Sequence, residues 1–156
     1  MNEKTEQLIF YLIKRHPECS ITSTMKLAYL IDLISVKKNK KQISNFQYRR
    51  YYFGPFDKKI YLYIESLIEK QAIVPKSDYA ITGKEFIVYS LNESSKYNND
   101  KINEKELKII DGLLESFKGY GAKILTEIAY KTKPMIALGA KIGNSKGIGL
   151  RLDLAK

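Results

Sequence analysis

The sequence predicts a mainly helical α+β fold, in which about five helices surround a small antiparallel sheet. Three observations predict this class. The chain has 156 residues, 44% of them hydrophobic and 28% charged, which is the balance of a globular chain with one modest core. Apolar residues recur at helical spacing over most of the chain. Runs rich in aromatic and β-branched residues are short and fall only within residues 46–53, 72–75 and 85–91.

Two helices are expected at the N-terminal end of the chain. Apolar residues at helical spacing predict one helix over residues 3–15 and a second over about residues 23–38. The hydroxyl groups of residues 20–23 can cap the second helix. The stripes that these helices should bury are Leu8, Ile9, Leu12 and Ile13 in the first, and Leu27, Leu30, Ile31 and Ile34 in the second.

A strand and a third helix are expected next. Residues 46–53 alternate as a half-buried strand does. Gly54-Pro55 should end this strand and fix its angle to the following helix, which we expect over residues 58–70. Asp57 is the predicted N-cap of that helix.

A hairpin is expected after the third helix. Its first strand, residues 72–75, should end at Pro75, and its second strand should cover residues 85–91. Three helices followed by a hairpin are also the order of a winged helix, so the predicted fold has a winged-helix-like helix and hairpin order.

Two more helices are expected after residue 102. Asn103 and Glu106 resemble a capping box, which predicts a helix that ends before Gly119. A shorter helix should cover about residues 122–131, and Pro134 should close it.

These elements predict one globular domain over residues 1–140. Residues 141–156 contain three of the nine glycines and several cations. We expect them to form a basic, glycine-rich C-terminal tail that is flexible. The run from Gly143 to Gly149 lacks the Gly-Lys-Ser/Thr spacing of a phosphate-binding loop.

The sequence offers little catalytic chemistry. His16 is the single histidine and Cys19 the single cysteine, and no third group is marked as an orienting partner for the pair. A metal site would need more ligands than these two. We therefore expect no enzyme, no catalytic residue, no metal and no cofactor. One cysteine excludes an internal disulfide, and no apolar run approaches a membrane span or a signal core, so we expect a cytoplasmic protein without a membrane partner.

The net charge of +10 is uneven along the chain. Residues 1–50 carry a net +6, residues 51–100 a net −1 and residues 101–156 a net +5. A basic chain is attracted to polyanions and to acidic protein surfaces. The predicted helix and hairpin that would read DNA are in the acidic middle segment, and only four of the 27 cations are Arg, so DNA is a secondary expectation.

Residues 46–61 interleave aromatic residues with four cations around Gly54-Pro55. Rings give contact area at low entropy cost and cations orient a partner, so this segment is the candidate contact surface. The alternative is that the aromatic residues fill the core. A strand exposes every second residue, so the set with Tyr48 and Arg50 and the set with Arg49 and Tyr51 cannot both face solvent. The candidate partner-binding residues are Tyr48, Arg49, Arg50, Tyr51, Phe53 and Phe56.

Three segments together resemble the Panacea domain, also called the SocA-like antitoxin domain of toxin–antitoxin systems. They are Met25 to Asp32, Tyr52 to Phe56 with the following Ile60-Tyr61, and Ile128 to Pro134. Tyr130 stands where the family often has His, and Met135 where Trp is common. The residues that match the family motifs are Lys26, Leu27, Tyr29, Gly54, Pro55, Tyr61 and Pro134.

The resemblance implies an antitoxin that neutralises a cognate protein toxin by direct binding, with the toxin encoded next to it. A relative in this family acts instead as an adaptor that delivers its toxin to a protease. The alternative function is that of a winged-helix-like DNA-binding regulator. Salt dependence separates the two, because binding driven by phosphates weakens steeply as salt rises.

Overall fold

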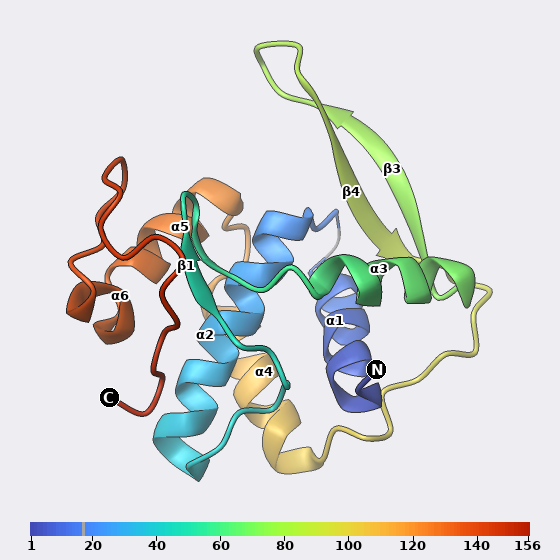
Figure 1. Ribbon diagram of the computed structural model, residues 1–156. Coiled ribbons are helices and arrows are strands. Elements are labelled where there is room, and N and C mark those ends of the chain that lie inside the picture. The colour runs from blue at the N-terminus through green and yellow to red at the C-terminus, as the bar shows by residue number, and fades with distance from the viewer. Residues whose placement is uncertain (17) are drawn as a thin grey trace.

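The computed structural model describes residues 1–16 and 18–156, and in these residues it shows six helices and two small antiparallel sheets (Figure 1). The mainly helical α+β class is therefore confirmed. The elements in chain order are α1 (Glu3–Arg15), α2 (Ile21–Asn39), β1 (Arg49–Tyr51), β2 (Gly54–Phe56), α3 (Ile60–Glu69), β3 (Ile73–Tyr79), β4 (Glu85–Leu91), α4 (Glu104–Ser116), α5 (Ala122–Tyr130) and α6 (Lys133–Ala137).

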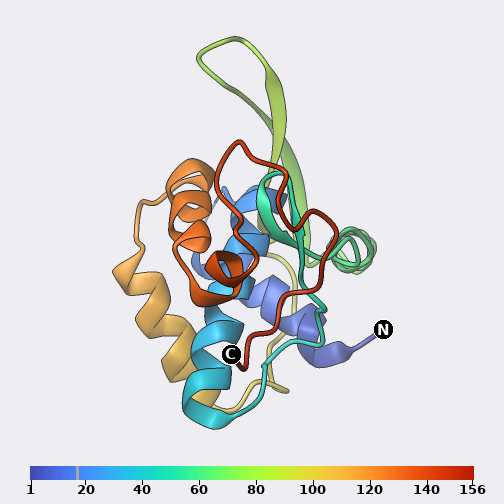
Figure 2. The same cartoon turned by 60° about the vertical axis from the view of Figure 1, so that its left-hand side comes forward.

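Helix α2 is the centre of the core. It contacts α1, α4, α5 and β2, and the two views of the ribbon show it running through the middle of the molecule (Figures 1 and 2). Residues 23–32 of α2 are buried without interruption, so the helix has no solvent-facing stripe there. Ser20 caps it, with its side-chain oxygen accepting the Ser23 N–H. The two charged residues of this stretch, Lys26 and Asp32, are consequently buried.

The first sheet is a tight hairpin, and the predicted single strand over residues 46–53 is wrong. Strand β1 pairs with β2 in the register Arg50↔Pro55, and the turn between them is Tyr52-Phe53. Gly54-Pro55 therefore begins the return strand and does not end the sheet. Pro55 is tolerated because the backbone N–H and C=O of Arg50, the residue opposite, bond to Leu150 and Gly149 on the other side of β1.

Part of the predicted tail completes this hairpin. The Leu150 carbonyl accepts the Arg50 N–H at 2.9 Å, the Gly149 N–H donates to the Arg50 carbonyl at 2.7 Å, and the Leu152 N–H donates to the Tyr48 carbonyl at 2.9 Å. The C-terminal trace lies beside β1 in both ribbon views (Figures 1 and 2). The expectation of a flexible tail is wrong for residues 149–152, whereas the domain boundary at residue 140 stays a prediction.

The second sheet is a hairpin that projects from the body (Figure 1). Strands β3 and β4 pair from Ile73↔Leu91 to Tyr79↔Glu85, so β3 does not end at Pro75 as predicted. Pro75 lies opposite Tyr89, whose own N–H and C=O bond to Cys19, so the missing proline N–H costs no ladder bond. The two hairpins form separate sheets, and the winged-helix-like order is not confirmed.

Helices α4 and α5 lie close to their predicted positions, whereas α6 was not predicted. Asn103 and Glu106 form the expected capping box at the start of α4. Pro134 does not close α5; it is in the first turn of α6, where its missing N–H is not needed. None of the helices in residues 1–16 and 18–156 is long and apolar enough to cross a membrane.

Candidate interaction surface

The turn of the β1–β2 hairpin presents large rings to solvent. Tyr52 is 69% exposed and Phe53 is 75% exposed, because the two-residue turn leaves neither ring a core to enter. Tyr51 precedes them and is 37% exposed. Phe56 on β2 packs its ring edge-on against Tyr51, with centroids 6.1 Å apart, and tilted against Tyr61 of α3 at 5.9 Å. We name these five side chains, Tyr51, Tyr52, Phe53, Phe56 and Tyr61, the aromatic patch.

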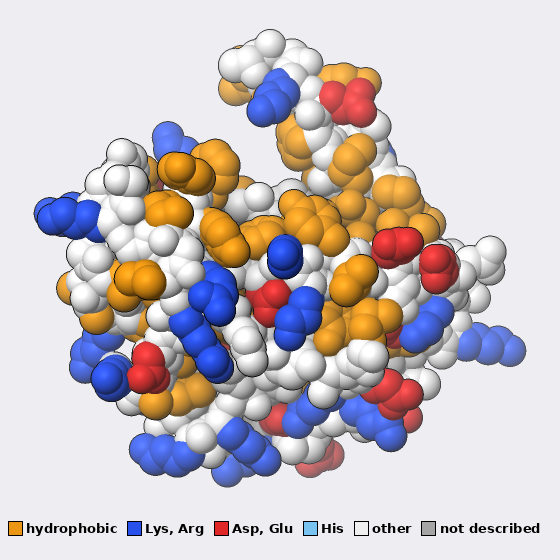
Figure 3. Space-filling model, viewed as in Figure 1, with side chains coloured by type: hydrophobic (Ala, Val, Ile, Leu, Met, Phe, Trp, Pro, Cys, Tyr) orange, Lys and Arg blue, Asp and Glu red, His pale blue; other side chains and the backbone are white. Residues whose placement is uncertain are grey.

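The aromatic patch surrounds a shallow hollow of about 510 Å³. Figure 3 shows hydrophobic side chains gathered over this part of the molecule, below the projecting hairpin, and continuing along that hairpin. An exposed contiguous apolar surface of this kind is typical of a protein contact site. The other residues that line the hollow are Thr22, Lys26, Gly54 and Lys58.

Lys26 is the buried charge of this hollow. Its side chain comes from the continuous buried stretch of α2 and is 1% exposed. The Nζ donates a hydrogen bond to the Pro55 carbonyl at 3.2 Å and lies 5.8 Å from the centroid of the Phe56 ring. None of the ion pairs in residues 1–16 and 18–156 includes Lys26. Burial lowers the pKa of its ammonium to about 8.

Gly54 allows the hairpin to approach Lys26. Its φ of +100° lies in a region that side chains disfavour. A Cβ at this position would also meet Lys26 Cε and Tyr130 Cε2, each at 3.4 Å. The positive φ therefore favours glycine here, and a Cβ would be at the tight edge of van der Waals contact with side chains from α2 and α5.

Arg50 belongs to the scaffold and not to the surface. It is completely buried, and its Nη2 donates to the Lys141 carbonyl at 3.1 Å and to the Asn144 carbonyl at 3.0 Å. Its guanidinium carbon lies 5.4 Å from the centroid of the Tyr130 ring. Tyr130 in turn donates its hydroxyl hydrogen to the Tyr52 carbonyl at 2.9 Å. Arg50 and Tyr130 thus hold the start of the C-terminal segment and the back of the aromatic patch together.

Tyr48 is also buried, and its hydroxyl donates to Asp32 Oδ2 at 2.6 Å. The Asp32 carboxylate accepts further hydrogen bonds from the N–H groups of Ile43 and Ser44. Complete burial raises the pKa of this carboxyl, and its hydrogen bonds oppose that rise. Of the candidate partner-binding residues, the structure therefore buries Tyr48 and Arg50, half-buries Phe56, and exposes Arg49, Tyr51 and Phe53.

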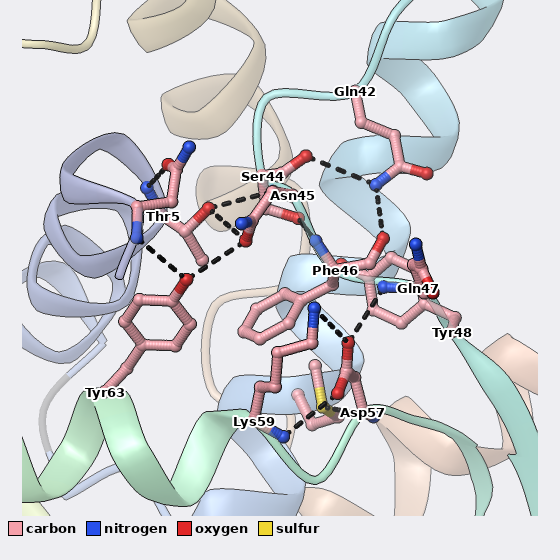
Figure 4. A network of polar contacts seen from close by, with 12 residues as sticks. Thr5, Gln42, Ser44, Asn45, Phe46, Gln47, Tyr48, Asp57, Lys59 and Tyr63 are labelled. Carbon is pink, nitrogen blue, oxygen red and sulfur yellow. Dashed lines mark hydrogen bonds and ion pairs between the residues drawn. The ribbon is translucent and has the colours of Figure 1, made fainter.

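A polar network fixes the segments on either side of the hairpin (Figure 4). Asn45 Oδ1 accepts from the hydroxyls of Thr5 on α1 and Tyr63 on α3. Asp57 accepts the Gln47 N–H at 2.8 Å and the Lys59 N–H at 2.9 Å. The predicted N-cap is thus displaced: α3 begins at Ile60, and Asp57 fixes the turn before it. These bonds fasten the base of the hairpin to the body, and the rings at its tip are exposed to solvent.

The residues of the family motifs converge at this place. Leu27 is fully buried in α2, and the hydroxyls of Tyr29 and Thr132 are 2.7 Å apart. Pro134 is buried in the first turn of α6, and Tyr61 is 54% exposed on α3. Three segments far apart in the sequence, α2, β2 and the end of α5, are therefore one packed unit behind the aromatic patch.

No candidate for catalysis gains support from the geometry. Burial raises the pKa of the Cys19 thiol to about 12, which keeps it protonated, and burial lowers the pKa of His16. Across residues 1–16 and 18–156, no group of three or more His, Cys, Asp or Glu side chains could hold a metal ion.

The sequence predicted Lys26 only as a family-motif residue; its burial in the hollow and the pairing of residues 149–152 with β1 were not predicted. Lys26 interrupts an apolar helical run at a position that must be buried, and that conflict was the available signal for it. No local pattern could predict the pairing of residues 149–152 with β1, because the two segments are about 100 residues apart in the sequence. One of their contacts is the hydrogen bond from Arg49 Nη1 to the Gly149 carbonyl.

The fold and this surface define an α+β domain that holds an aromatic hairpin rigidly against a central helix. The chain belongs to the antitoxin SocA-like, Panacea domain family, whose model matches residues 24–134, more than half of the chain. The matched range contains all three segments that converge behind the aromatic patch, whereas α1 and the C-terminal segment lie outside it. No curated protein and no solved structure matches the chain significantly.

Proposed function

We propose that this protein neutralises a cognate protein toxin by binding it directly through the aromatic patch. The observation that carries the proposal is the solvent exposure of Tyr52 and Phe53 at the tip of a rigid hairpin in an antitoxin-family domain. Aromatic side chains are the residues that dominate binding energy at protein interfaces, since they bury much area at little cost in conformational entropy. The toxin is proposed to be encoded next to this protein and the pair to act in the cytoplasm, without enzymatic chemistry in the antitoxin.

The positive charge around the aromatic patch also supports a protein toxin as the partner. Arg49 and Lys58 are exposed beside the patch, and the whole chain carries +10. Cations around an apolar centre steer an acidic partner and raise its association rate. We therefore propose that the toxin presents an acidic rim around an apolar centre, and that Arg49, Tyr51, Phe53 and Phe56 contact it together with Tyr52 and Tyr61.

DNA binding receives less support than toxin binding. The projecting β3–β4 hairpin carries Lys76 and Lys84, which Asp78 and Glu85 balance, and Lys76 pairs with Glu18 at 3.6 Å. A wing that contacts phosphates would carry an excess of cations.

The test is a growth assay in which the neighbouring open reading frame is expressed with this protein or its variants. Phe53→Ala and Tyr52→Ala should each weaken toxin binding by at least about tenfold and lose protection, since exposed rings at an interface centre are typical hot spots. Both variants should unfold at the wild-type temperature, because neither ring is in the core. The matched control is Ile136→Ala, an apolar residue 61% exposed on α6, which should protect fully.

The assay separates the proposal from its alternatives. If the wild-type protein gives no protection against the neighbouring gene product, the antitoxin function is wrong. If the wild type protects and the ring variants protect equally well, the toxin binds elsewhere and the aromatic patch is not its contact site.

A further inference from the structure

The ammonium group of Lys26 has bonding capacity that the protein does not use. An ammonium carries three N–H donors, and one of them bonds to the Pro55 carbonyl at 3.2 Å. In the described residues no carboxylate lies within ion-pair distance of it. Buried charges in proteins are ordinarily paired, because removal from water costs several kcal/mol per ion. A lysine that is 1% exposed and has no counter-ion is therefore an exception that needs an explanation.

The hollow above Lys26 has the composition of a site for an anion. Its lining contains two cations, Lys26 and Lys58, and no Asp or Glu. The rest of the lining is mostly aromatic, from the patch itself. Low-dielectric walls strengthen any ion pair that forms between them.

Gly54 lies directly beside the Lys26 ammonium. The Cβ of any other residue at this position would be 3.9 Å from Lys26 Nζ, in contact with it, and 3.4 Å from Cε. In this site α2 supplies the charge, and β2 supplies the carbonyl and the glycine. The aromatic walls come from β1 and the turn after it, from β2 and from the first turn of α3.

We propose that this hollow receives an acidic side chain of the partner protein, flanked by apolar residues, whose carboxylate pairs with the Lys26 ammonium. The inference rests on the proposed function and adds the chemistry of the toxin segment: one Asp or Glu between residues that pack on the aromatic patch. A single ammonium matches the single charge of a carboxylate, and the aromatic walls match the neighbouring side chains. Of the two cations, Lys58 is exposed to water and only Lys26 presents a buried charge, so phosphate, with up to two charges, would keep part of its charge without a buried partner.

Binding of two matched peptides to the full-length protein tests this directly. The probes are acetyl-Phe-Glu-Phe-amide and acetyl-Phe-Gln-Phe-amide, which differ only in the carboxylate. The readout is the ¹³Cε and ¹Hε resonances of Lys26, identified by their loss in Lys26→Met. The glutamate peptide should shift these resonances at a concentration at least about tenfold lower than the glutamine peptide, since a charge-assisted bond replaces a neutral one.

Two variants control the experiment. Lys26→Met should bind both peptides alike, and a normal circular dichroism spectrum will show that it folds. Lys38→Met makes the same change on the same helix at an exposed position about 18 Å along the axis, and it should keep the preference for glutamate.

Three results would overturn the inference: equal binding of the two peptides, no shift of the Lys26 resonances with either peptide at millimolar concentration, or displacement of the glutamate peptide by inorganic phosphate at a lower concentration. None of these results depends on the toxin. The growth assay can therefore fail while the carboxylate site stands, and the reverse is equally possible.

Discussion

Replacing Lys26 by Met should make the protein more stable while removing its proposed contact. The substitution keeps the length and apolar character of the side chain and removes the buried charge. Burial lowers the pKa of Lys26 from 10.5 to about 8, which corresponds to a penalty of about 3 kcal/mol for the charged form at neutral pH. The variant leaves the buried Pro55 carbonyl without its donor, which costs about 1 to 2 kcal/mol. The net expectation is a gain of about 1 to 2 kcal/mol in the free energy of unfolding at pH 7.

The pH dependence of this gain follows from the same pKa. Between about pH 8 and 10.5 the unfolded chain keeps the Lys26 proton and the folded chain loses it, so the unfolded state binds more protons and wild-type stability rises with pH. Buried tyrosines change the stability in the opposite direction. Burial raises the pKa of Tyr29 from 10.0 to about 12, so above about pH 10 the folded state binds more protons than the unfolded state and the free energy of unfolding falls as pH rises. The difference between wild type and Lys26→Met isolates the lysine.

Urea denaturation near pH 7 and near pH 9.5 measures the stability gain of Lys26→Met and its dependence on pH. The advantage of Lys26→Met should shrink by about 2 kcal/mol between these conditions, as the wild-type lysine becomes neutral. The control Lys38→Met should be within about 0.5 kcal/mol of the wild type at both pH values, because its side chain is exposed. A Lys26→Met protein that is less stable than the wild type, by an amount that does not change with pH, would refute the view that Lys26 is a buried charge without a partner.

Three further predictions concern the scaffold. Gly54→Ala should lower the free energy of unfolding by about 2 kcal/mol. The control Gly83→Ala also has a positive φ, +85°, but no atom lies within 4 Å of its new Cβ, so it should be destabilised only by backbone strain and therefore by less. Equal losses in thermal unfolding would contradict a contribution from the contacts with Lys26 and Tyr130. Arg50→Met should abolish the hydrogen-exchange protection of the Leu152 N–H, whereas the backbone N–H groups in the core of α2 should stay protected. Unchanged protection at Leu152 would mean that Arg50 does not hold the C-terminal segment. Cys19 should resist alkylation in the folded protein at pH 8 and react in urea, since burial raises its pKa to about 12; rapid native-state reaction would show that the thiol is accessible.

The helices could be predicted from the sequence because their signals are local. The first helix has the predicted bounds, and the capping box of Asn103 and Glu106 was visible as a pair of residues three apart. The strands were harder, because Pro55 and Pro75 read as breaks. Each proline is tolerated only because the residue opposite it, Arg50 or Tyr89, bonds to a segment distant in sequence.

The candidate surface could be located but not resolved into its exposed and buried residues. The aromatic segment predicted the place, and the alternation of the strand separated Tyr48 and Arg50 from Arg49 and Tyr51. Which set faces solvent is decided by the C-terminal segment and by Tyr130, since they cover the buried side of Arg50. No local pattern contains that information.

Co-purification with the neighbouring open reading frame, followed by mass spectrometry of the bound species, tests the central claim most directly. We expect a stoichiometric protein that inhibits growth when expressed alone and stays bound through a high-salt wash, because its contact is centred on the rings of Tyr52 and Phe53. Recovery of nucleic acid that is lost in high salt, with no protein partner, would contradict the account and favour a DNA-binding role.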